Sequence, residues 1–319
     1  MLNEDQKKKY IELLMDYKNN PNWISNFYNY KNSLLPKKLY RYRTSNSYNL
    51  KALKGNYIWL NSPDKFNDIY DCMLNIDSEL LLLYNVLNNN WYKNNPFEKD
   101  EIQSLLFAEK EIKKGSMDLD LFISYLKSNN NEHIHEKLTS SPYFISYKDM
   151  YDCLQQFNAN PEPYKKMVVK CKTACFSETY DNILMWSHYA KYNKGFCVEY
   201  DTSKCKEITK KLYPILYISE PIFCPNLMND YADGKADISI SQTIFSTMKF
   251  EDWQCEKEWR IFSGEQKIEM PSLPSCIYLG VNIKQYEQRK ICKIADKLGI
   301  PVKKMQLLEG KFKLIAVDI

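Results

Sequence analysis

The sequence predicts an α+β fold, with a mostly antiparallel, split sheet, packed helices and a helical insertion. Three patterns support this prediction. Short segments rich in β-branched and aromatic residues occur near the start of the chain and again in its second half, as separate strands do. Residues 78–160 instead show the helical spacing of apolar side chains. Strands, then a block of helices, then further strands are typical of an α+β domain.

The order of these patterns divides the chain into four parts. Residues 1–36 are expected to form N-terminal helices, and residues 37–77 to form the first part of the α+β core. Residues 78–160 are the predicted helical insertion, because their helical segments are joined by polar links rich in Asn and Ser. Residues 161–319 are expected to complete the core.

Local periodicity and turn residues predict the individual elements. Strands are expected at 37–44, 57–61, 166–177, 195–201, 212–218, 258–262 and 276–283. Helices are expected at 4–18, at 181–192 with Asp181 as N-cap, at 237–249, and at 284–299, where Gly299 ends an amphipathic pattern. The last two segments of the chain are predicted to form a hairpin through residues 309–311.

Composition and common motifs exclude several classes of protein. The net charge of +4 over 319 residues is too small to predict a dedicated nucleic-acid-binding protein, although it is compatible with a local basic face. The sequence has no G-x-G-x-x-G or P-loop pattern, which disfavours the common nucleotide-binding folds. It also has no G-x-S-x-G or H-E-x-x-H pattern, which disfavours common hydrolases and zinc proteases.

The cysteines and the apolar segments indicate a cytoplasmic protein. Ten cysteines are scattered along the chain, and we expect them to be reduced thiols. The charged N-terminal segment is not typical of a secretory signal, and no apolar run is long enough for a membrane span. Cys171 and Cys175 lack a matching second pair of ligands, so no metal site is expected.

Two arginines stand out in the segment "LYRYR". Side chains two apart share a face of a strand, so Arg41 and Arg43 are expected on one face and Tyr40 and Tyr42 on the other. Buried arginines need partners, because burying an unpaired charge is costly. The pair therefore indicates either a binding site or an edge strand whose arginines lie in water.

The segment "CFSETYDNILMWSHYA" carries a second group of candidate residues. Ser177 ends a predicted strand, and Trp186 and Tyr189 fall on one face of the following helix with His188 beside them. Histidine titrates near neutral pH and often acts in catalysis. The alternative is that His188 is a hydrogen-bonded packing residue among aromatic side chains.

The segment "WQCEKEWRIF" carries the third group. If it is a strand, Glu256, Glu258 and Arg260 point to one face, and Trp259 points to the other. Two acids and one base on a shared face can form the wall of an active site. The alternative is that the acids pair with arginine across the sheet while the tryptophan fills the core.

Together these segments resemble a known bacterial family. "LYRYR", "WLNSPDKFNDIYDC", "ACFSETYDNILMWSHYAKYNKGFCVEYD" and "EKEWRI" look like motifs of the domain-of-unknown-function family 2971. The resemblance runs from about Leu39 to Gly280 and is weakest in the helical insertion. It implies a phage-defence or toxin setting, with a partner protein in a defence or toxin–antitoxin system.

A more distant resemblance links the chain to ADP-ribosyltransferases of the Arg-Ser-Glu type. These enzymes have an arginine in an early strand, a serine ending a later strand, and a glutamate, often within Glu-x-Glu, on a strand further on. The chain is similar in that order: Arg41 or Arg43, then Ser177, then Glu258 with Glu256 before it. It departs from the family where Cys-Phe-Ser replaces Ser-Thr-Ser.

This second resemblance implies NAD as the substrate and assigns a role to each candidate. An arginine would bind the pyrophosphate bidentately, and Trp186 or Tyr189 would form an aromatic wall for nicotinamide. Glu258 would stabilise an oxocarbenium-like state, and Glu256 would position or deprotonate the acceptor, a protein or a nucleic acid. The remaining candidates are assigned to catalysis (Ser177 and His188) and to cofactor binding (Tyr40).

Two other functions fit the same residues. The first is a non-catalytic sensor or protein-binding module, in which the charged residues form structural ion pairs without a cleft. The second is a metal-dependent effector acting on nucleic acids. It requires an acid from the group Asp68, Asp71 and Glu178 near Glu256 and Glu258, and a basic rim.

Overall fold

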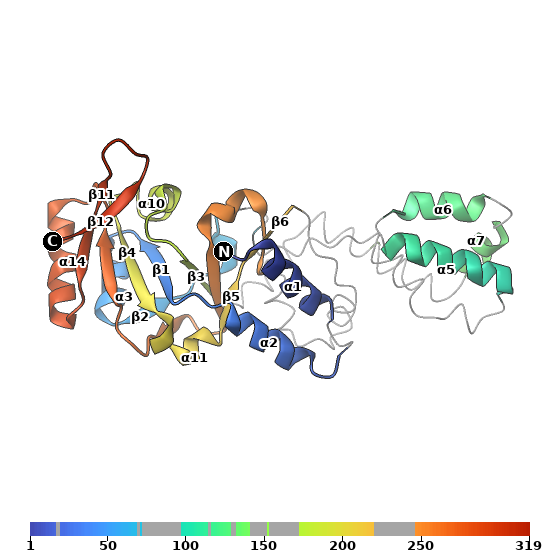
Figure 1. Ribbon diagram of the computed structural model, residues 1–319, viewed down its shortest axis with the longest axis horizontal. Helices are drawn as coiled ribbons and strands as arrows, with labels where there is room; N and C mark the ends of the chain where they lie inside the picture. The colour runs from blue at the N-terminus through green and yellow to red at the C-terminus, as the bar shows by residue number, and fades with distance from the viewer. Residues whose placement is uncertain are drawn as a thin grey trace. The chain divides into compact units, whose positions relative to one another are not determined.

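The computed structural model contains two compact units (Figure 1). The described residues are 1–16, 20–68, 71, 97–113, 116–128, 132–140, 152, 172–219 and 246–319. The first unit comprises Met1–Met73, Lys166–Glu220 and Asp237–Ile319, and the second comprises Leu74–Lys165 and Pro221–Ala236. The second unit thus takes in the predicted insertion at 78–160 together with a later segment that the sequence did not associate with it.

An eight-stranded sheet forms the centre of the first unit. Its strand order is β12-β11-β10-β4-β1-β3-β8-β5. Neighbouring strands are antiparallel except β10 and β11, so the predicted mostly antiparallel sheet is confirmed. The strands are β1 (Lys38–Arg43), β3 (Lys172–Ser177), β4 (Phe196–Asp201), β5 (Leu212–Pro214), β8 (Glu258–Ser263), β10 (Cys276–Leu279), β11 (Val302–Leu307) and β12 (Leu314–Asp318).

The parallel pair β10–β11 needs a crossover connection, which helix α14 (Gln285–Leu298) supplies. Gly299 ends α14 in the left-handed conformation, at φ 66°, as the sequence predicts. Strands β11 and β12 then form the predicted C-terminal hairpin. Two small sheets accompany the large one: β2 (Tyr57–Trp59) with β9 (Lys267–Glu269), and β6 (Leu216–Ile218) with β7 (Met248–Phe250).

Strands β1 and β3 separate after a single residue pair. Tyr40 pairs with Ser177, whereas β1 and β4 pair along six residues. Further along β3, Thr173 pairs instead with Asn61, each backbone N–H donating to the other residue's carbonyl at 2.8 and 2.9 Å. The divergence of two central strands opens the large sheet at its middle.

Helices cover both faces of the large sheet. On one face, α14 and α3 (Ser47–Lys54) enclose the main apolar core, which includes Leu39, Phe196 and Ile291. On the other face, α10 (Ile183–Tyr189) encloses a second core. The remaining helical segments of the unit are α1 (Glu4–Met15), α2 (Trp23–Ser33), η1 (Pro63–Lys65), η3 (Thr202–Lys204), α11 (Lys206–Thr209) and η4 (Glu251–Glu256).

The described part of the second unit is helical and has its own apolar core. Helices α5 (Lys99–Lys113), α6 (Leu119–Lys127) and α7 (Glu132–Thr139) bury Leu105, Phe122 and Ile134 against one another. None of the helices in the described ranges has the length and apolar composition needed to cross a membrane.

The strand predicted at 212–218 is two strands, β5 and β6, which belong to different sheets. Two predictions about helices are also wrong. The end of the helix predicted at 237–249 is strand β7, since Met248–Phe250 pairs with β6; residues 237–245 lie outside the described part. Helix α10 begins after Asn182, rather than after Asp181. The Asn182 side chain accepts hydrogen bonds from the backbone N–H groups of Leu184 and Met185, as an N-cap residue does.

Candidate functional site

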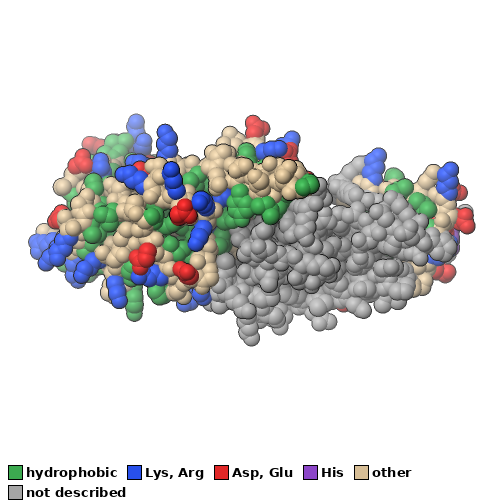
Figure 2. Space-filling view, turned by 90° about the horizontal axis from the view of Figure 1, so that it is seen from below, with side chains coloured by type: hydrophobic (Ala, Val, Ile, Leu, Met, Phe, Trp, Pro, Cys, Tyr) green, Lys and Arg blue, Asp and Glu red, His purple; other side chains and the backbone are tan. Residues whose placement is uncertain are grey.

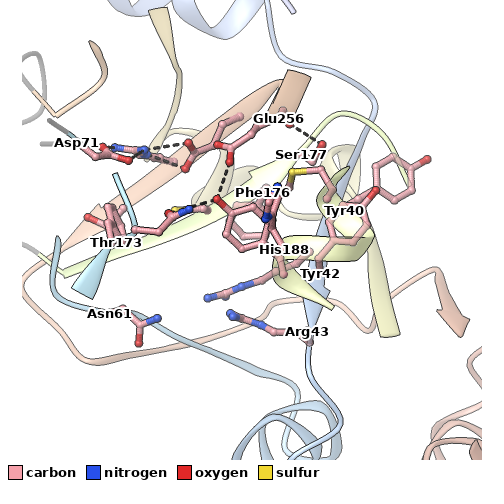
Figure 3. Close-up of a pocket in the computed structure, with 18 of the residues that line it drawn as sticks. Tyr40, Tyr42, Arg43, Asn61, Asp71, Thr173, Phe176, Ser177, His188 and Glu256 are labelled. Atoms are coloured by element: carbon pink, nitrogen blue, oxygen red, sulfur yellow. Dashed lines mark hydrogen bonds and ion pairs between the residues drawn. The ribbon is translucent and has the colours of Figure 1, made fainter. Parts of the chain in front are cut away.

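A cavity of about 460 Å³ lies where β1 and β3 separate (Figure 3). Its walls come from β1, β3, β8, α10, Lys249 and the segment around η1. In the view of Figure 3, Glu256 and Ser177 lie on one side, and Arg43 and Asn61 lie on the opposite side. The volume is within the range typical of small-molecule sites, so the split in the sheet produces a credible binding pocket.

Strand β1 supplies two arginines to this cavity. β1 is flanked by β4 and β3, so the alternative of an edge strand with exposed arginines is wrong. Arg41 is 5% exposed; its Nη2 donates to the Trp59 carbonyl at 2.7 Å, and its guanidinium lies 5.5 Å from the centre of the Phe176 ring. Arg43 is half-buried, and burial lowers the pKa of its guanidinium.

Several polar atoms at this end of the cavity lack partners. In the described part of the chain, no acidic side chain forms an ion pair with Arg41 or Arg43. The Nε of Arg41 and the Oγ1 of Thr173 are buried without a hydrogen-bond partner. Buried donors are almost always satisfied in proteins, so these groups are suited to an anionic, hydrogen-bonding ligand.

Two glutamates line the opposite side of the cavity, but they come from two different elements. The shared face expected for the two glutamates required a strand through both, but Glu256 ends the 3-10 helix η4 and Glu258 begins β8, where a strand was predicted. Lys257, between them, adopts the left-handed conformation at φ 47°. Both carboxylates nevertheless contact Lys249, whose Nζ lies 2.6 Å from Glu256 and 3.4 Å from Glu258.

An ion-pair network surrounds Glu258. Arg260, which is fully buried, donates to both Glu258 oxygens at 2.7 and 2.9 Å, and to both Asp71 oxygens at 2.6 and 2.7 Å. Burial alone would raise the pKa of Glu258, but the charges of Arg260 and Lys249 outweigh it and lower that pKa to about 2. Glu258 is therefore ionised at neutral pH.

Glu256 has the opposite electrostatic character. Burial and the neighbouring charge of Glu258 raise the pKa of Glu256, although Lys249 opposes the shift. The Tyr189 hydroxyl donates to its Oε1 at 2.5 Å. The site thus pairs a carboxylate whose pKa is lowered with one whose pKa is raised, an arrangement that occurs in acid–base catalysis.

Helix α10 divides the predicted aromatic and histidine residues between two environments. Tyr189 and the exposed His188 line the cavity. Trp186 is fully buried outside it, packed edge-on against Tyr42 at 5.3 Å between ring centres. Trp186 points into the core, so the prediction that it forms an aromatic wall for nicotinamide is wrong. For Tyr189, which lines the cavity, the same role stays a prediction.

Ser177 connects the two carboxylate-bearing segments. Its hydroxyl is fully buried and donates to the Glu256 carbonyl at 2.7 Å. In the sheet, Ser177 pairs with Glu258 on one side and with Tyr40 on the other, and Tyr40 also lines the cavity. Arg41, Ser177 and Glu258, predicted from distant segments, thus meet in one cavity.

Sequence reasoning missed Lys249, and it did not predict which residue pairs with Asp71. Lys249 lies in a segment with no distinctive motif, where a helix was predicted. Asp71 belongs to the noted "SPDKFNDIYDC" loop, but its pairing with Arg260 could not be read from the sequence. The metal hypothesis places Asp71 beside Glu258, yet Arg260 and Lys249 lie between these acids, and the described residues include no group arranged to hold a metal ion.

One family model matches the chain. It is described as a protein of unknown function (DUF2971) and covers residues 185–261. The chain is similar to that family over this segment. The segment includes Tyr189, Glu256, Glu258 and Arg260 but not β1 or Ser177, so it is narrower than the resemblance read from the motifs. No curated protein and no solved structure matches the chain.

Proposed function

We propose that the protein is an ADP-ribosyltransferase-like enzyme that cleaves the glycosidic bond between nicotinamide and ribose in NAD. One observation carries the proposal: Arg41, Ser177 and Glu258 lie on the neighbouring strands β1, β3 and β8 and line one cavity. That is the order and grouping that the resemblance to the Arg-Ser-Glu enzymes requires. The toxin or defence setting, with a partner protein, remains an expectation from family 2971.

The arginine end of the cavity suits the pyrophosphate of NAD. Guanidinium groups bind phosphate oxygens through paired, charge-assisted hydrogen bonds. The free Nε of Arg41 and the unpaired guanidinium of Arg43 would both gain partners. A ligand there would also accept a hydrogen bond from the Thr173 hydroxyl. Binding of the diphosphate would place the nicotinamide ribose toward the glutamates.

The glutamate end supplies the charges that the reaction needs. Bond cleavage leaves positive charge on the ribose while the electron pair departs with nicotinamide. The ionised Glu258 would stabilise that charge within a buried site. The acceptor then bonds to C1′ and releases its proton to Glu256, whose raised pKa suits it to hold one.

The binding-module alternative rests on a separate observation. Glu258 already accepts hydrogen bonds from Arg260 and lies 3.4 Å from Lys249, so its carboxylate serves an internal network. The expectation that such a network lies without a cleft is wrong, because the cavity is beside it. A binding module would therefore use these contacts to fix the end of β8 and would bind a ligand in the cavity without reaction. Measuring catalysis directly separates the two functions.

The decisive test is nicotinamide release from NAD, measured by chromatography, with the wild type and two matched variants. Glu258→Gln removes the proposed stabilising charge and should lower release by about two orders of magnitude or more. Glu199→Gln is the control, because Glu199 is an equally buried carboxylate of β4 that does not line the cavity. Thermal unfolding of each variant verifies that it is folded at the assay temperature.

Two results would argue against cleavage. Release that is equal in the wild type and Glu258→Gln would remove the glutamate from the mechanism. No release by the folded wild type, even with cell lysate as a source of acceptors, would favour the binding module. In either case, calorimetric titration of Arg41→Gln and Arg43→Gln with ADP-ribose would show whether the arginines bind a diphosphate.

A further inference from the structure

The outer face of helix α14 carries a continuous positive surface. Arg289, Lys290, Lys293 and Lys297 are all exposed and fall within about 100° of one another around the helix. Figure 2 shows Lys and Arg side chains at the left edge of the first unit, where α14 lies. We define these four residues as the α14 basic stripe.

The charge of this stripe is not neutralised locally. In the described part of the chain, none of its four side chains forms an ion pair with an acid. Of the acids of α14, Glu287 is 9% exposed and accepts a hydrogen bond from the Tyr286 hydroxyl at 3.3 Å, and Asp296 is exposed at the edge of the stripe. The local positive potential therefore contrasts with the small net charge of the whole chain.

An aromatic ring lies at the N-terminal end of the stripe. Tyr286 is 54% exposed, so its ring is accessible to a ligand. Lys290 lies 5.5 Å from its ring centre and Lys284 lies 6.0 Å from it. An exposed ring flanked by cations offers a platform on which a nucleobase can stack while phosphates contact the lysines.

The neighbouring helix also carries exposed cations. Helix α3 packs against α14 and presents the exposed Lys51 and Lys54, with no acidic residue in its sequence. Along α14, Lys290 and Lys297 are separated by about 10 Å, roughly the axial length of three phosphates on one strand. The surface thus matches a polyanion with bases better than an isolated phosphate.

We propose that the α14 basic stripe, with Tyr286, binds single-stranded nucleic acid. Two features favour this partner: several cations along one line and an exposed ring among them. An acidic protein or an anionic membrane would satisfy the cations but would leave no role for the ring. The inference does not depend on NAD cleavage, because the stripe and the cavity share no residue.

The test is fluorescence anisotropy with a labelled 20-nucleotide mixed-sequence RNA, its DNA counterpart and a DNA duplex, at about 50 and 200 mM salt. Wild-type protein should bind the single strands and lose affinity as salt rises. Lys290→Glu/Lys293→Glu should weaken binding at least tenfold. Tyr286→Ala should weaken binding to single strands several-fold and affect the duplex less.

A matched control separates the stripe from net charge. Lys8→Glu/Lys9→Glu changes the charge of the exposed α1 surface by the same amount, and Lys9 already pairs with Glu12 at 3.7 Å. This control should bind nucleic acid as the wild type does. The proposal fails if both double variants lose affinity equally, if the wild type does not bind, or if it binds only anionic lipid vesicles or polyglutamate. Nicotinamide release is measured separately and should be unaffected by either double variant.

Discussion

Two buried glutamates in one row of the sheet are stabilised in different ways. The row runs from Glu199 through Tyr40 and Ser177 to Glu258. Glu199 accepts hydrogen bonds from the hydroxyls of Ser275 at 2.7 Å and Tyr278 at 2.6 Å, and pairs with the half-exposed Lys38 at 2.9 Å. These contacts satisfy one charge, and Glu199 does not line the cavity.

Glu258 belongs to a larger and more costly arrangement. Three carboxylates and two cations are buried together: Asp71, Glu256, Glu258, Lys249 and Arg260. Burying ions rarely adds stability over an apolar core, because desolvation offsets their attraction. The Glu199 side shows that this sheet can accommodate a carboxylate with two hydroxyl donors and one half-exposed lysine. The additional buried charges beside the cavity therefore indicate that this part of the sheet is a functional site.

The largest expected difference between the two sides concerns their cations. Arg260→Met should lower the free energy of unfolding by about 3–5 kcal/mol, because Asp71 and Glu258 would stay buried without their main partner. Lys38→Met should cost less than about 1 kcal/mol, since Lys38 is half-exposed and Glu199 keeps two hydroxyl donors. Urea denaturation measures both.

A combined variant tests the reason for that difference. Arg260→Met with Glu258→Leu removes one of the stranded charges and should recover part of the lost stability. If Arg260→Met lowers the free energy of unfolding no more than Lys38→Met does, the buried charges beside the cavity do not depend on Arg260 more than Glu199 depends on Lys38.

The pH dependence of stability should have opposite signs on the two sides. Burial and Glu258 raise the pKa of Glu256 above 4.5, so its deprotonation makes folding less favourable as pH rises through that range. Burial would raise the pKa of Glu199 too, but hydrogen bonds from Tyr278, Lys38 and Ser275 lower it below 4.5. Glu199 therefore contributes stability that is present above pH 4.5 and is lost as pH falls.

Urea unfolding of Glu256→Gln and Glu199→Gln, followed from about pH 3 to pH 7, measures this contrast. Relative to the wild type, Glu256→Gln should gain stability as pH rises, and Glu199→Gln should lose it. Parallel curves for the two variants would mean that the carboxylates do not differ in the way their partners indicate.

The sequence predicted which residues line the cavity better than it predicted the ion pairs between them. Alternation in a strand placed Arg41 and Arg43 on one face, and the end of a strand placed Ser177. These are local properties, so periodicity was sufficient. Lys249 and Asp71 join the network only through tertiary contacts with Glu258 and Arg260.

The sequence also did not predict the backbone conformation at Lys257 or the orientation of the side chains of α10. A left-handed residue is most often glycine, so Lys257 gave no sign of a break before β8. Trp186 and Tyr189 were expected on one helix face, and both contact the same apolar core. Trp186 is fully buried there, whereas the hydroxyl of Tyr189 reaches Glu256 in the cavity.

Removing one tyrosine hydroxyl on each side should have a moderate effect on stability. Tyr189→Phe deletes the hydrogen bond to Glu256, and Tyr278→Phe deletes the one to Glu199. Each should lower the free energy of unfolding by about 1–3 kcal/mol, since each bond goes to a carboxyl group.

Nicotinamide release then separates the two tyrosines. Under the proposed function, Tyr189→Phe should change its pH profile, because the proton affinity of Glu256 is altered, and Tyr278→Phe should not. Equal effects on release would assign both tyrosines a structural role.

The smallest expected effect concerns the backbone at Lys257. Its left-handed conformation lets Glu256 and Glu258 reach Lys249 from the same side, whereas Glu199 lies in a regular strand beside Val198. Lys257→Gly should stay within about 0.5 kcal/mol of the wild type in urea denaturation, because relief of backbone strain and the entropy of glycine nearly cancel. Lys257→Val should cost about 1–3 kcal/mol, since a β-branched residue is strained there. If glycine were as harmful as valine, the lysine side chain, and not the backbone, would hold the two carboxylates together.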